Sequence, residues 1–335
     1  MTNDELLQVI EQASRDNVTE LDLSGNELIE LSPEIGQLTS LQTLNISHNQ
    51  LRTLPSEIIQ LSNLQKLNLS YNYLSQLPPE IGQLAELKIL LLGDENLDRF
   101  FFDDDQIWNN NKLKKLPSEI GKLTNLKQLV LSENSLNCLP PEIGYLYNLE
   151  KLDLRSNPLS ELPPEIGQLT RLKELDLSNT LLNTLPPEIG QLTCLEILNI
   201  RESQLIILPE EIKQLSELKW LDLRGNNLPI PAKILGHHDL LFGKPRPPQK
   251  ILEYLDRIQA DDKQPINEAK ILFVGSSAVG KTSLVNRLLF NKFNLNEQRT
   301  AGIDIKSWSI SINNQKVKLN VWDLSGQKIM CATNR

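Results

Sequence analysis

Residues 149–171 read "LEKLDLRSNPLSELPPEIGQLTR", and the spacing of their leucines, asparagine and prolines predicts the local structure. Leu152 and Leu154 lie two residues apart, the spacing at which both side chains of a short strand point to the same side. Asn157 follows where the chain leaves the strand, and its amide can hydrogen-bond the backbones of adjacent turns. Pro164 suits the first position of a helical turn because it has no amide hydrogen to donate. The stretch therefore predicts a strand, a turn and a short helix.

This phrase repeats along most of the chain with the pattern LxxLxLxxNxLxxLPxEIxxLxx. Its nine copies begin at Val18, Leu41, Leu64, Leu87, Leu126, Leu149, Leu172, Leu195 and Leu218. Seven of the eight steps measure 23 residues, and the fourth step, of 39 residues, holds a 16-residue insertion at 95–110. One copy cannot bury its leucines alone, so the copies must stack. The pattern is similar to that of the leucine-rich repeat family.

The repeats predict an α/β fold built around a solenoid over residues 18–242. Because successive strands stack side by side in the same direction, we expect a parallel sheet on the concave face and short helices on the convex face. Residues 1–17 precede the first copy and carry apolar side chains at helical spacing, which predicts an amphipathic helix that caps the core.

The outward-facing strand positions of this solenoid mix polar and apolar side chains, which favours a protein partner over nucleic acid. The candidate contact residues are Trp220, Ile197, Leu91, Val130, Phe101 and Trp108. Phe101 and Trp108 belong to the insertion, where aromatic side chains stand beside three consecutive aspartates. Two interpretations stay open for the insertion: a partner site, or a loop that covers its own solenoid flank. Trp220 is either a central binding residue or a cover for the end of the sheet.

Net charge changes sign along the chain. Residues 1–235 carry 19 Lys and Arg against 34 Asp and Glu, a net charge of −15, whereas residues 236–335 carry 15 against 9, a net charge of +6. The change marks a domain boundary and places basic residues on the part that would meet phosphates. The N-terminus lacks the features of a signal peptide and no long apolar run occurs, so we expect a cytoplasmic protein without a membrane span.

A phosphate-binding motif follows a linker with a short helix, predicted at 243–267. The stretch "AKILFVGSSAVGKTSLVNRLLF" joins an apolar strand, the pattern GxxxxGK[ST] and a helix. Its phosphate-binding residues are Gly275, Ser276, Ser277, Ala278, Val279, Gly280, Lys281, Thr282 and Ser283. Backbone amides of such a loop wrap the phosphates, Lys281 reaches the β- and γ-phosphates, and Thr282 offers its hydroxyl to Mg²⁺. The sequence therefore predicts a nucleotide-binding domain at 268–335.

Two further motifs connect this domain to a family. Thr300 stands in a TxGI phrase, and Asp323, Gly326 and Gln327 spell DxxGQ. Leucine-rich repeats followed by these motifs in this order resemble the Roco family, whose Roc domain is a Ras-like GTPase that binds GTP or GDP. The resemblance implies that Thr300 and Asp323 join Thr282 at the Mg²⁺ ion. It also implies that Gly326 binds the γ-phosphate and that Gln327 is catalytic, because it would orient the attacking water.

The resemblance covers the front of the family's architecture. No [NT]KxD phrase, which would read guanine, occurs in residues 1–335, and neither kinase motifs nor the COR domain through which the family pairs are found. We therefore expect a Roc domain truncated within its fold, with weak or absent GTP hydrolysis. The sequence predicts no particular oligomeric state, because the COR domain is not found in it. Two functions stay open: a GTP-controlled signalling switch with a protein-binding repeat arm, and a repeat scaffold with an inert GTPase remnant.

Overall fold

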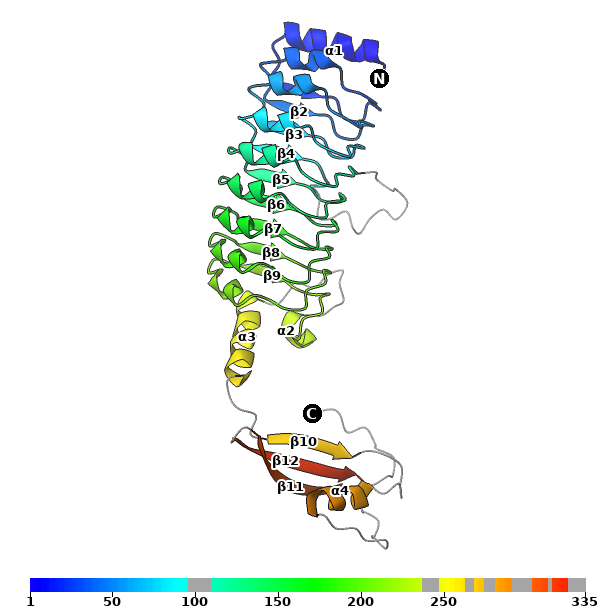
Figure 1. Cartoon of the computed structure of the whole chain (residues 1–335). Helices are drawn as coiled ribbons and strands as arrows, with labels where there is room; N and C mark the ends of the chain where they lie inside the picture. The colour runs from blue at the N-terminus through cyan, green and yellow to red at the C-terminus, as the bar shows by residue number, and fades with distance from the viewer. Residues whose placement is uncertain are drawn as a thin grey trace. The chain divides into compact units, whose positions relative to one another are not determined.

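The computed structural model describes residues 1–95, 110–236, 247–262, 268–273, 281–290, 303–312 and 315–324. The chain divides into two compact units, Met1–Leu255 and Asp256–Arg335. The first unit is a repeat solenoid, and the second is a small sheet with one described helix (Figure 1).

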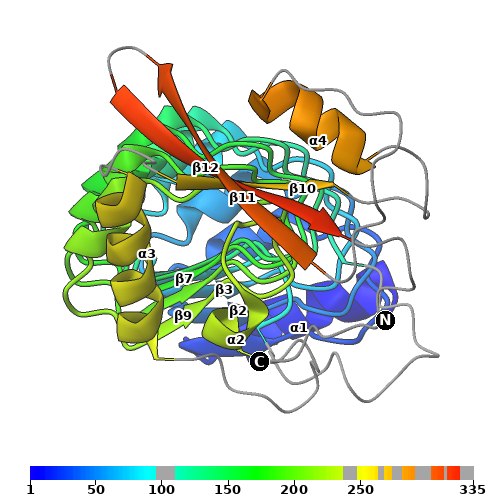
Figure 2. The ribbon, with the colours of Figure 1, turned by 90° about the horizontal axis from the view of Figure 1, so that it is seen from below.

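The solenoid is built on a parallel sheet whose nine strands follow one another in chain order. The strands are β1 (Glu20–Asp22), β2 (Thr43–Asn45), β3 (Lys66–Asn68), β4 (Ile89–Leu91), β5 (Gln128–Val130), β6 (Lys151–Asp153), β7 (Glu174–Asp176), β8 (Ile197–Asn199) and β9 (Trp220–Asp222). The middle leucine of each strand pairs in register with that of the next, as Leu152 does with Leu175. Figure 2 looks along the stack and shows these strands one behind another.

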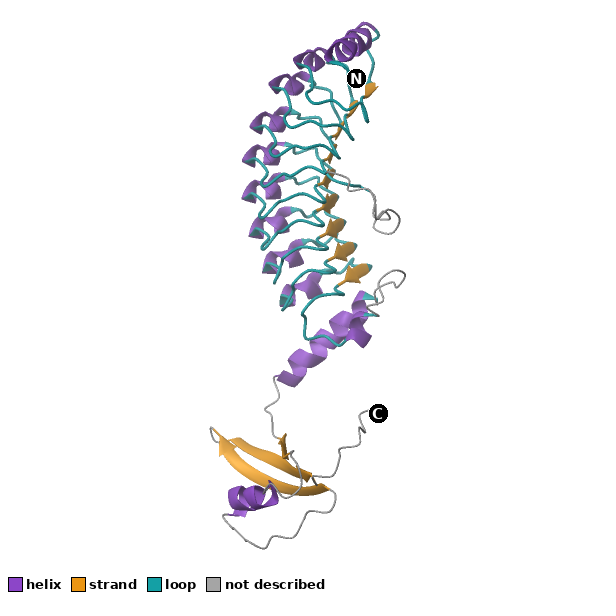
Figure 3. Ribbon diagram, turned by 90° about the vertical axis from the view of Figure 1, so that its right-hand side faces the viewer, coloured by secondary structure: helices purple, strands orange, loops and turns teal. Residues whose placement is uncertain are grey.

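Short 3-10 helices form the opposite side of the solenoid, as Figure 3 shows. Those described are η1 (Pro33–Gln37), η2 (Ser56–Gln60), η3 (Pro79–Gln83), η5 (Ser118–Lys122), η6 (Pro141–Tyr145), η7 (Pro164–Gln168), η8 (Pro187–Gln191) and η9 (Glu210–Gln214). Each comes from the LPxEI segment and turns its isoleucine inward, so that Ile166 is fully buried. The predicted fold class, with a parallel sheet on one face and short helices on the other, is confirmed.

Asparagine side chains link successive repeats inside the solenoid. The amide nitrogen of Asn157 donates to the carbonyl oxygens of Leu131, Leu154 and Arg155 at 2.9, 3.0 and 3.2 Å. Its amide oxygen accepts a hydrogen bond from the backbone nitrogen of Leu136 at 3.0 Å. Because these backbone groups are buried, the side chain satisfies donors and acceptors that water cannot reach. The predicted ladder is therefore present.

The ladder continues through the two repeats that lack the asparagine. Thr180 and Ser203 take its place, and their hydroxyl oxygens lie 2.9 Å apart. Both hydroxyls also reach the carbonyl oxygen of Leu177, at 2.9 and 3.0 Å. On the other side of the insertion, Asn111 holds the ladder position and donates to the carbonyl oxygens of Leu69 and Leu92.

Helices close both ends of the solenoid core. Helix α1 (Asn3–Arg15) starts with a capping box between Thr2 and Glu5 and buries Leu6 and Ile10 against the first repeats. At the other end, α2 (Ala232–Leu235) contributes a buried leucine to the same core. Helix α3 (Pro248–Asp262) buries Ile251 completely in the core of the solenoid. The start of the helix predicted for the linker therefore packs as part of the first unit.

The second unit contains a three-stranded sheet of order β10-β12-β11. Its described elements are β10 (Glu268–Phe273), α4 (Lys281–Phe290), β11 (Ile303–Ile312) and β12 (Gln315–Leu324). Strands β10 and β12 are parallel, whereas β11 and β12 pair as an antiparallel hairpin. Helix α4 contacts β12. Among the described residues of both units, no helix is long and apolar enough to cross a membrane.

Candidate functional site

The strand order of the second unit brings two nucleotide motifs to one edge of the sheet. Strand β10 ends at Phe273, two residues before Gly275 at the start of the GxxxxGK[ST] motif, and α4 begins at Lys281. In the parallel pairing of β10 with β12, Phe273 lies opposite Asp323. The carboxyl ends of both strands therefore meet at this edge, with Asp323 opposite the last residue of β10.

This edge has the components that phosphates require. Helix α4 has ten residues, and its N-terminus carries the positive end of the helix dipole. Thr282 and Ser283 lie in that first turn, and their side chains are half-buried. The Thr282 hydroxyl and the Asp323 carboxylate are oxygen donors of the kind that Mg²⁺ prefers, and they belong to elements that contact each other. The residues present thus fit a phosphate group with its magnesium ion.

Several predicted site residues lie outside the described residues. They are Gly275, Ser276, Ser277, Ala278, Val279, Gly280, Thr300, Gly326 and Gln327 of the nucleotide motifs, and Phe101 and Trp108 of the insertion. Of the predicted nucleotide site, the structure describes the first residues of α4 and residue Asp323 of β12, and these two elements contact each other. The roles of the others stay predictions from the sequence.

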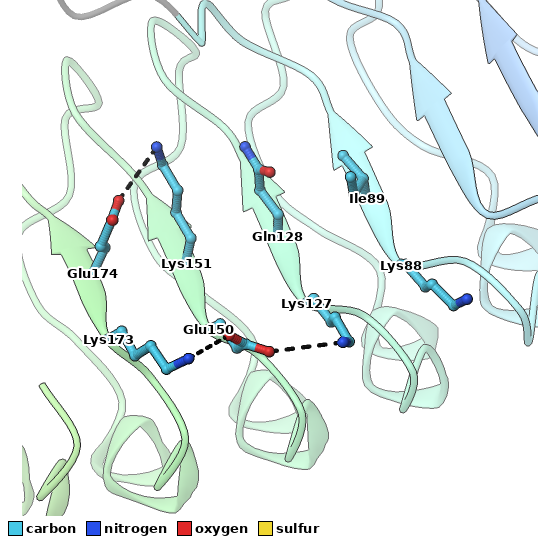
Figure 4. Close-up of a pocket in the computed structure, with 8 residues that line it drawn as sticks. All are labelled: Lys88, Ile89, Lys127, Gln128, Glu150, Lys151, Lys173 and Glu174. Atoms are coloured by element: carbon cyan, nitrogen blue, oxygen red, sulfur yellow. Dashed lines mark hydrogen bonds and ion pairs between the residues drawn. The ribbon is translucent and has the colours of Figure 1, made fainter.

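A second candidate site is a groove of about 450 Å³ on the sheet side of the solenoid, which we call the lysine groove. Figure 4 shows that two rows of side chains line it. One row, from the residues just before each strand, contains Lys88, Lys127, Glu150 and Lys173. The other row, from the first strand residues, contains Ile89, Gln128, Lys151 and Glu174. The groove thus extends across strands β4 to β7.

Ion pairs connect neighbouring repeats within the lysine groove. Glu150 lies 2.7 Å from the ammonium of Lys173 and 3.8 Å from that of Lys127, and Lys151 lies 3.3 Å from Glu174. The hydrogen bond from Lys173 holds the pKa of Glu150 below its usual value. All these side chains are partly exposed, so solvent screens each pair and it contributes little to the stability of the fold. The pairs leave the charges accessible to a partner.

The prediction that Leu91 and Val130 contact a partner is wrong. Leu91 is 2% exposed and Val130 is 0% exposed, so both side chains are buried although they occupy strand positions predicted to face outward. They pair in register on β4 and β5, and the same repeats contain a buried polar layer. The guanidinium of Arg155 donates to the carbonyl oxygen of Asp94 two repeats away, and Ser132 of the intervening repeat donates to the same oxygen at 2.7 Å.

This polar layer also changes the acidity of its carboxyl groups. Burial raises the pKa of Asp153 to about 7, although the positive charge of Arg155 acts in the opposite direction. The ion pair between Arg155 Nε and Asp153 Oδ2 measures 3.4 Å. Burial and the negative charge of Asp94 likewise raise the pKa of Glu133.

Trp220 and Ile197 lie on adjacent strands at the far end of the sheet, where they pair in register. Ile197 is 37% exposed and Trp220 is half-buried, so both keep surface for a partner. Their role in binding stays a prediction.

The lysine groove was not predicted from the sequence. The contact residues predicted in the repeats occupy strand positions, whereas Lys88, Lys127 and Lys173 stand one residue earlier, directly after the first leucine of their repeats. The signal that would reveal them is the recurrence of lysine at this second position of the phrase. Glu150 interrupts that recurrence between the second and third lysines.

Comparison with protein-family models finds two kinds of match. The model described as "Leucine rich repeat" matches residues 16–74, 39–97, 106–159, 147–205 and 170–228, together more than half of the chain. The model described as "Ras of Complex, Roc, domain of DAPkinase" matches residues 270–335.

Solved structures similar to this chain are repeat proteins. A leucine-rich repeat protein of Leptospira interrogans is 32% identical, over 67% of this chain and 71% of that one, with a TM-score of 0.48. The leucine-rich repeat domain of the type III effector XopL is 28% identical, over 69% of this chain and 78% of that one, with a TM-score of 0.55. The plant peptide hormone receptor RGFR1, in complex with RGF2, is 31% identical, over 59% of this chain and 30% of that one, with a TM-score of 0.50.

Proposed function

The chain belongs to the leucine-rich repeat family and carries a Roc match after its repeats, and from this premise we propose that it is a GTP-binding switch of the Roco type. In this proposal the repeats are an arm that binds a protein partner on the concave face. The second unit binds GTP or GDP together with Mg²⁺ at the edge formed by β10, α4 and β12. The proposed setting is signalling in the cytoplasm.

One observation carries the nucleotide part of the proposal: the pairing of Phe273 with Asp323 in β10 and β12. A chance GxxxxGK[ST] match would not place a DxxGQ aspartate next to its own loop. Here the strand before the loop is the neighbour of the strand that ends in DxxGQ, and α4 starts where the loop ends. This arrangement supports a phosphate site shared by both motifs.

Each motif residue has a defined task in this proposal. The loop amides and the first turn of α4 hold the phosphates, and Lys281 binds the β- and γ-phosphate oxygens. Thr282, Thr300 and Asp323 would hold Mg²⁺, which when bound neutralises charge on the phosphates. Gly326 donates its amide to the γ-phosphate, and Gln327 orients the water that attacks it. The contacts of Gly326 and Gln327 require the γ-phosphate, so they would form with GTP and be absent with GDP.

The nucleotide part is tested by titrating the whole chain with a fluorescent GTP analogue in the presence of Mg²⁺. We expect Lys281→Ala to weaken binding at least tenfold, because a charge-assisted hydrogen bond contributes about 1.5 to 3 kcal/mol. Lys316→Ala is the matched control. It removes the same charge from β12, but Lys316 lies seven residues before Asp323, about 23 Å along the strand from the proposed site.

Equal effects of Lys281→Ala and Lys316→Ala would contradict the proposed site. Absence of GTP binding by the unmodified chain would contradict the switch itself, and the repeat scaffold with an inert GTPase remnant would replace it. Hydrolysis is measured separately, since Gln327→Ala should lower the turnover of bound GTP without weakening its binding.

A further inference from the structure

We propose that the lysine groove binds an acidic, extended segment of a protein partner. The proposal depends on the protein-binding role proposed for the repeats and specifies the chemistry of that partner. It begins from the charge of the groove, which contains Lys88, Lys127, Lys151 and Lys173 but only two carboxylates. This net charge of +2 stands within a region of the chain, residues 1–235, whose net charge is −15.

The positive charge is least balanced at the β4 and β5 end of the groove. Glu150 is closer to Lys173, at 2.7 Å, than to Lys127, at 3.8 Å. In the described part of the chain, Lys88 donates to the neutral amide oxygen of Gln65, at 2.9 Å. The ammonium groups of Lys88 and Lys127 therefore attract an additional carboxylate, which a partner can supply.

The lysine side chains of the groove are exposed enough for a partner to reach them. The side chain of Lys127 is 58% exposed and that of Lys173 is 52% exposed. A partner carboxylate can therefore pair with them without burying an unpaired charge, which is the main cost of ionic contacts in interfaces. Ile89 lies in the row beside them, between Lys88 and Gln128 in chain order, and offers an apolar contact in the same groove (Figure 4).

The dimensions of the groove suit an extended chain. Strands β4 to β7 are adjacent in the sheet, and three gaps of about 4.8 Å span about 14 Å. An extended segment of four or five residues has this length and directs alternate side chains to one side, about 7 Å apart. This spacing is longer than the separation of about 4.8 Å between successive strands, but the flexible lysine side chains can bridge the difference, while the residue between two acidic residues points away.

The glutamates of the groove argue against a nucleic acid as the ligand. Glu150 and Glu174 lie directly beside Lys173 and Lys151, so a regular row of phosphates would meet a carboxylate along with each of these lysines. A nucleic acid carries a phosphate at every nucleotide and cannot avoid them. A peptide can place a neutral or basic residue opposite each glutamate.

The experiment measures the fluorescence anisotropy of a labelled peptide of alternating glutamate and alanine, titrated with the whole chain at low ionic strength. The test variant is Lys88→Glu/Lys127→Glu. We expect it to weaken binding at least tenfold, since it removes two attractive pairs and introduces two repulsive ones. The matched control is Lys112→Glu/Lys114→Glu, which changes the net charge of the chain by the same amount as the test variant. Both control positions are exposed and lie outside the groove. This control should change the affinity less than twofold.

Three outcomes would overturn the proposal: no measurable binding of the acidic peptide, equal losses in both double variants, or tighter binding of a single-stranded oligonucleotide of equal charge. Binding should also weaken as salt is raised, because exposed charges are screened. The GTP titration on the same samples separates the two proposals. If the chain binds GTP through Lys281 but does not bind the peptide, the proposed role of the lysine groove is excluded and the GTP switch stands. If it binds the peptide but not GTP, the GTP switch is excluded and the proposed role of the groove stands.

Discussion

Replacing Asn157 with alanine tests whether the asparagine ladder holds the solenoid together. The side chain is 2% exposed and takes part in four hydrogen bonds to backbone groups. Without it, the Leu136 amide hydrogen loses its acceptor in a dry core, which costs about 1 to 3 kcal/mol. The carbonyl of Leu131 keeps a second donor, Asn134 at 3.1 Å, so its loss is smaller. We expect the free energy of unfolding to fall by about 2 to 4 kcal/mol.

The assay is urea unfolding followed by circular dichroism, with stability taken from the midpoint and slope of the transition. Asn63→Ala is the matched control, because Asn63 is exposed and donates one hydrogen bond, to the carbonyl oxygen of Thr39 at 2.8 Å. We expect this exposed change to alter stability by about 0.5 kcal/mol or less. If both variants shifted the midpoint equally, the reasoning that buried ladder bonds stabilise the stack would be refuted.

Two other predictions concern the same unit. Folding raises the pKa of Asp153 to about 7, so between about pH 4 and 7 its carboxyl group is protonated in the native state but ionised in the unfolded chain. The free energy of unfolding should therefore fall as the pH rises from about 4 to 7. Asp153→Asn should flatten this slope in urea titrations across that range, and an unchanged slope would contradict the assignment. A β-carbon on Gly167 would lie 2.7 Å from the carbonyl oxygen of Glu188, so Gly167→Ala should cost about 1 to 3 kcal/mol in thermal unfolding. Lys213→Ala, at the same position of the last repeat, should be nearly neutral, and equal losses would show that close packing between repeats is not the cause.

The repeat phrase was sufficient to predict most of the solenoid. The two-residue spacing of Leu152 and Leu154, the asparagine after the strand and the LPxEI turn each concern one short segment, and each was found as predicted. The backbone detail of the turn was not predicted. The residue before the ladder position adopts a positive φ even where it is not glycine, as Ser156 does at 55°. The stack stabilises this conformation through the hydrogen bond from the Ser156 backbone nitrogen to the carbonyl oxygen of Ser178.

The order of domains, the register of the repeats and the identity of the nucleotide motifs could be read from the sequence, because these depend on residues close together in the chain. Which side chains lie next to each other across the repeats became visible in the folded chain. Arg155 donates a hydrogen bond to the carbonyl oxygen of Asp94, 61 residues earlier and two repeats away. Lys88 and Lys127 lie 39 residues apart in the chain yet line one groove. Stacking at about 4.8 Å per strand creates these neighbours, and no local pattern contains that distance.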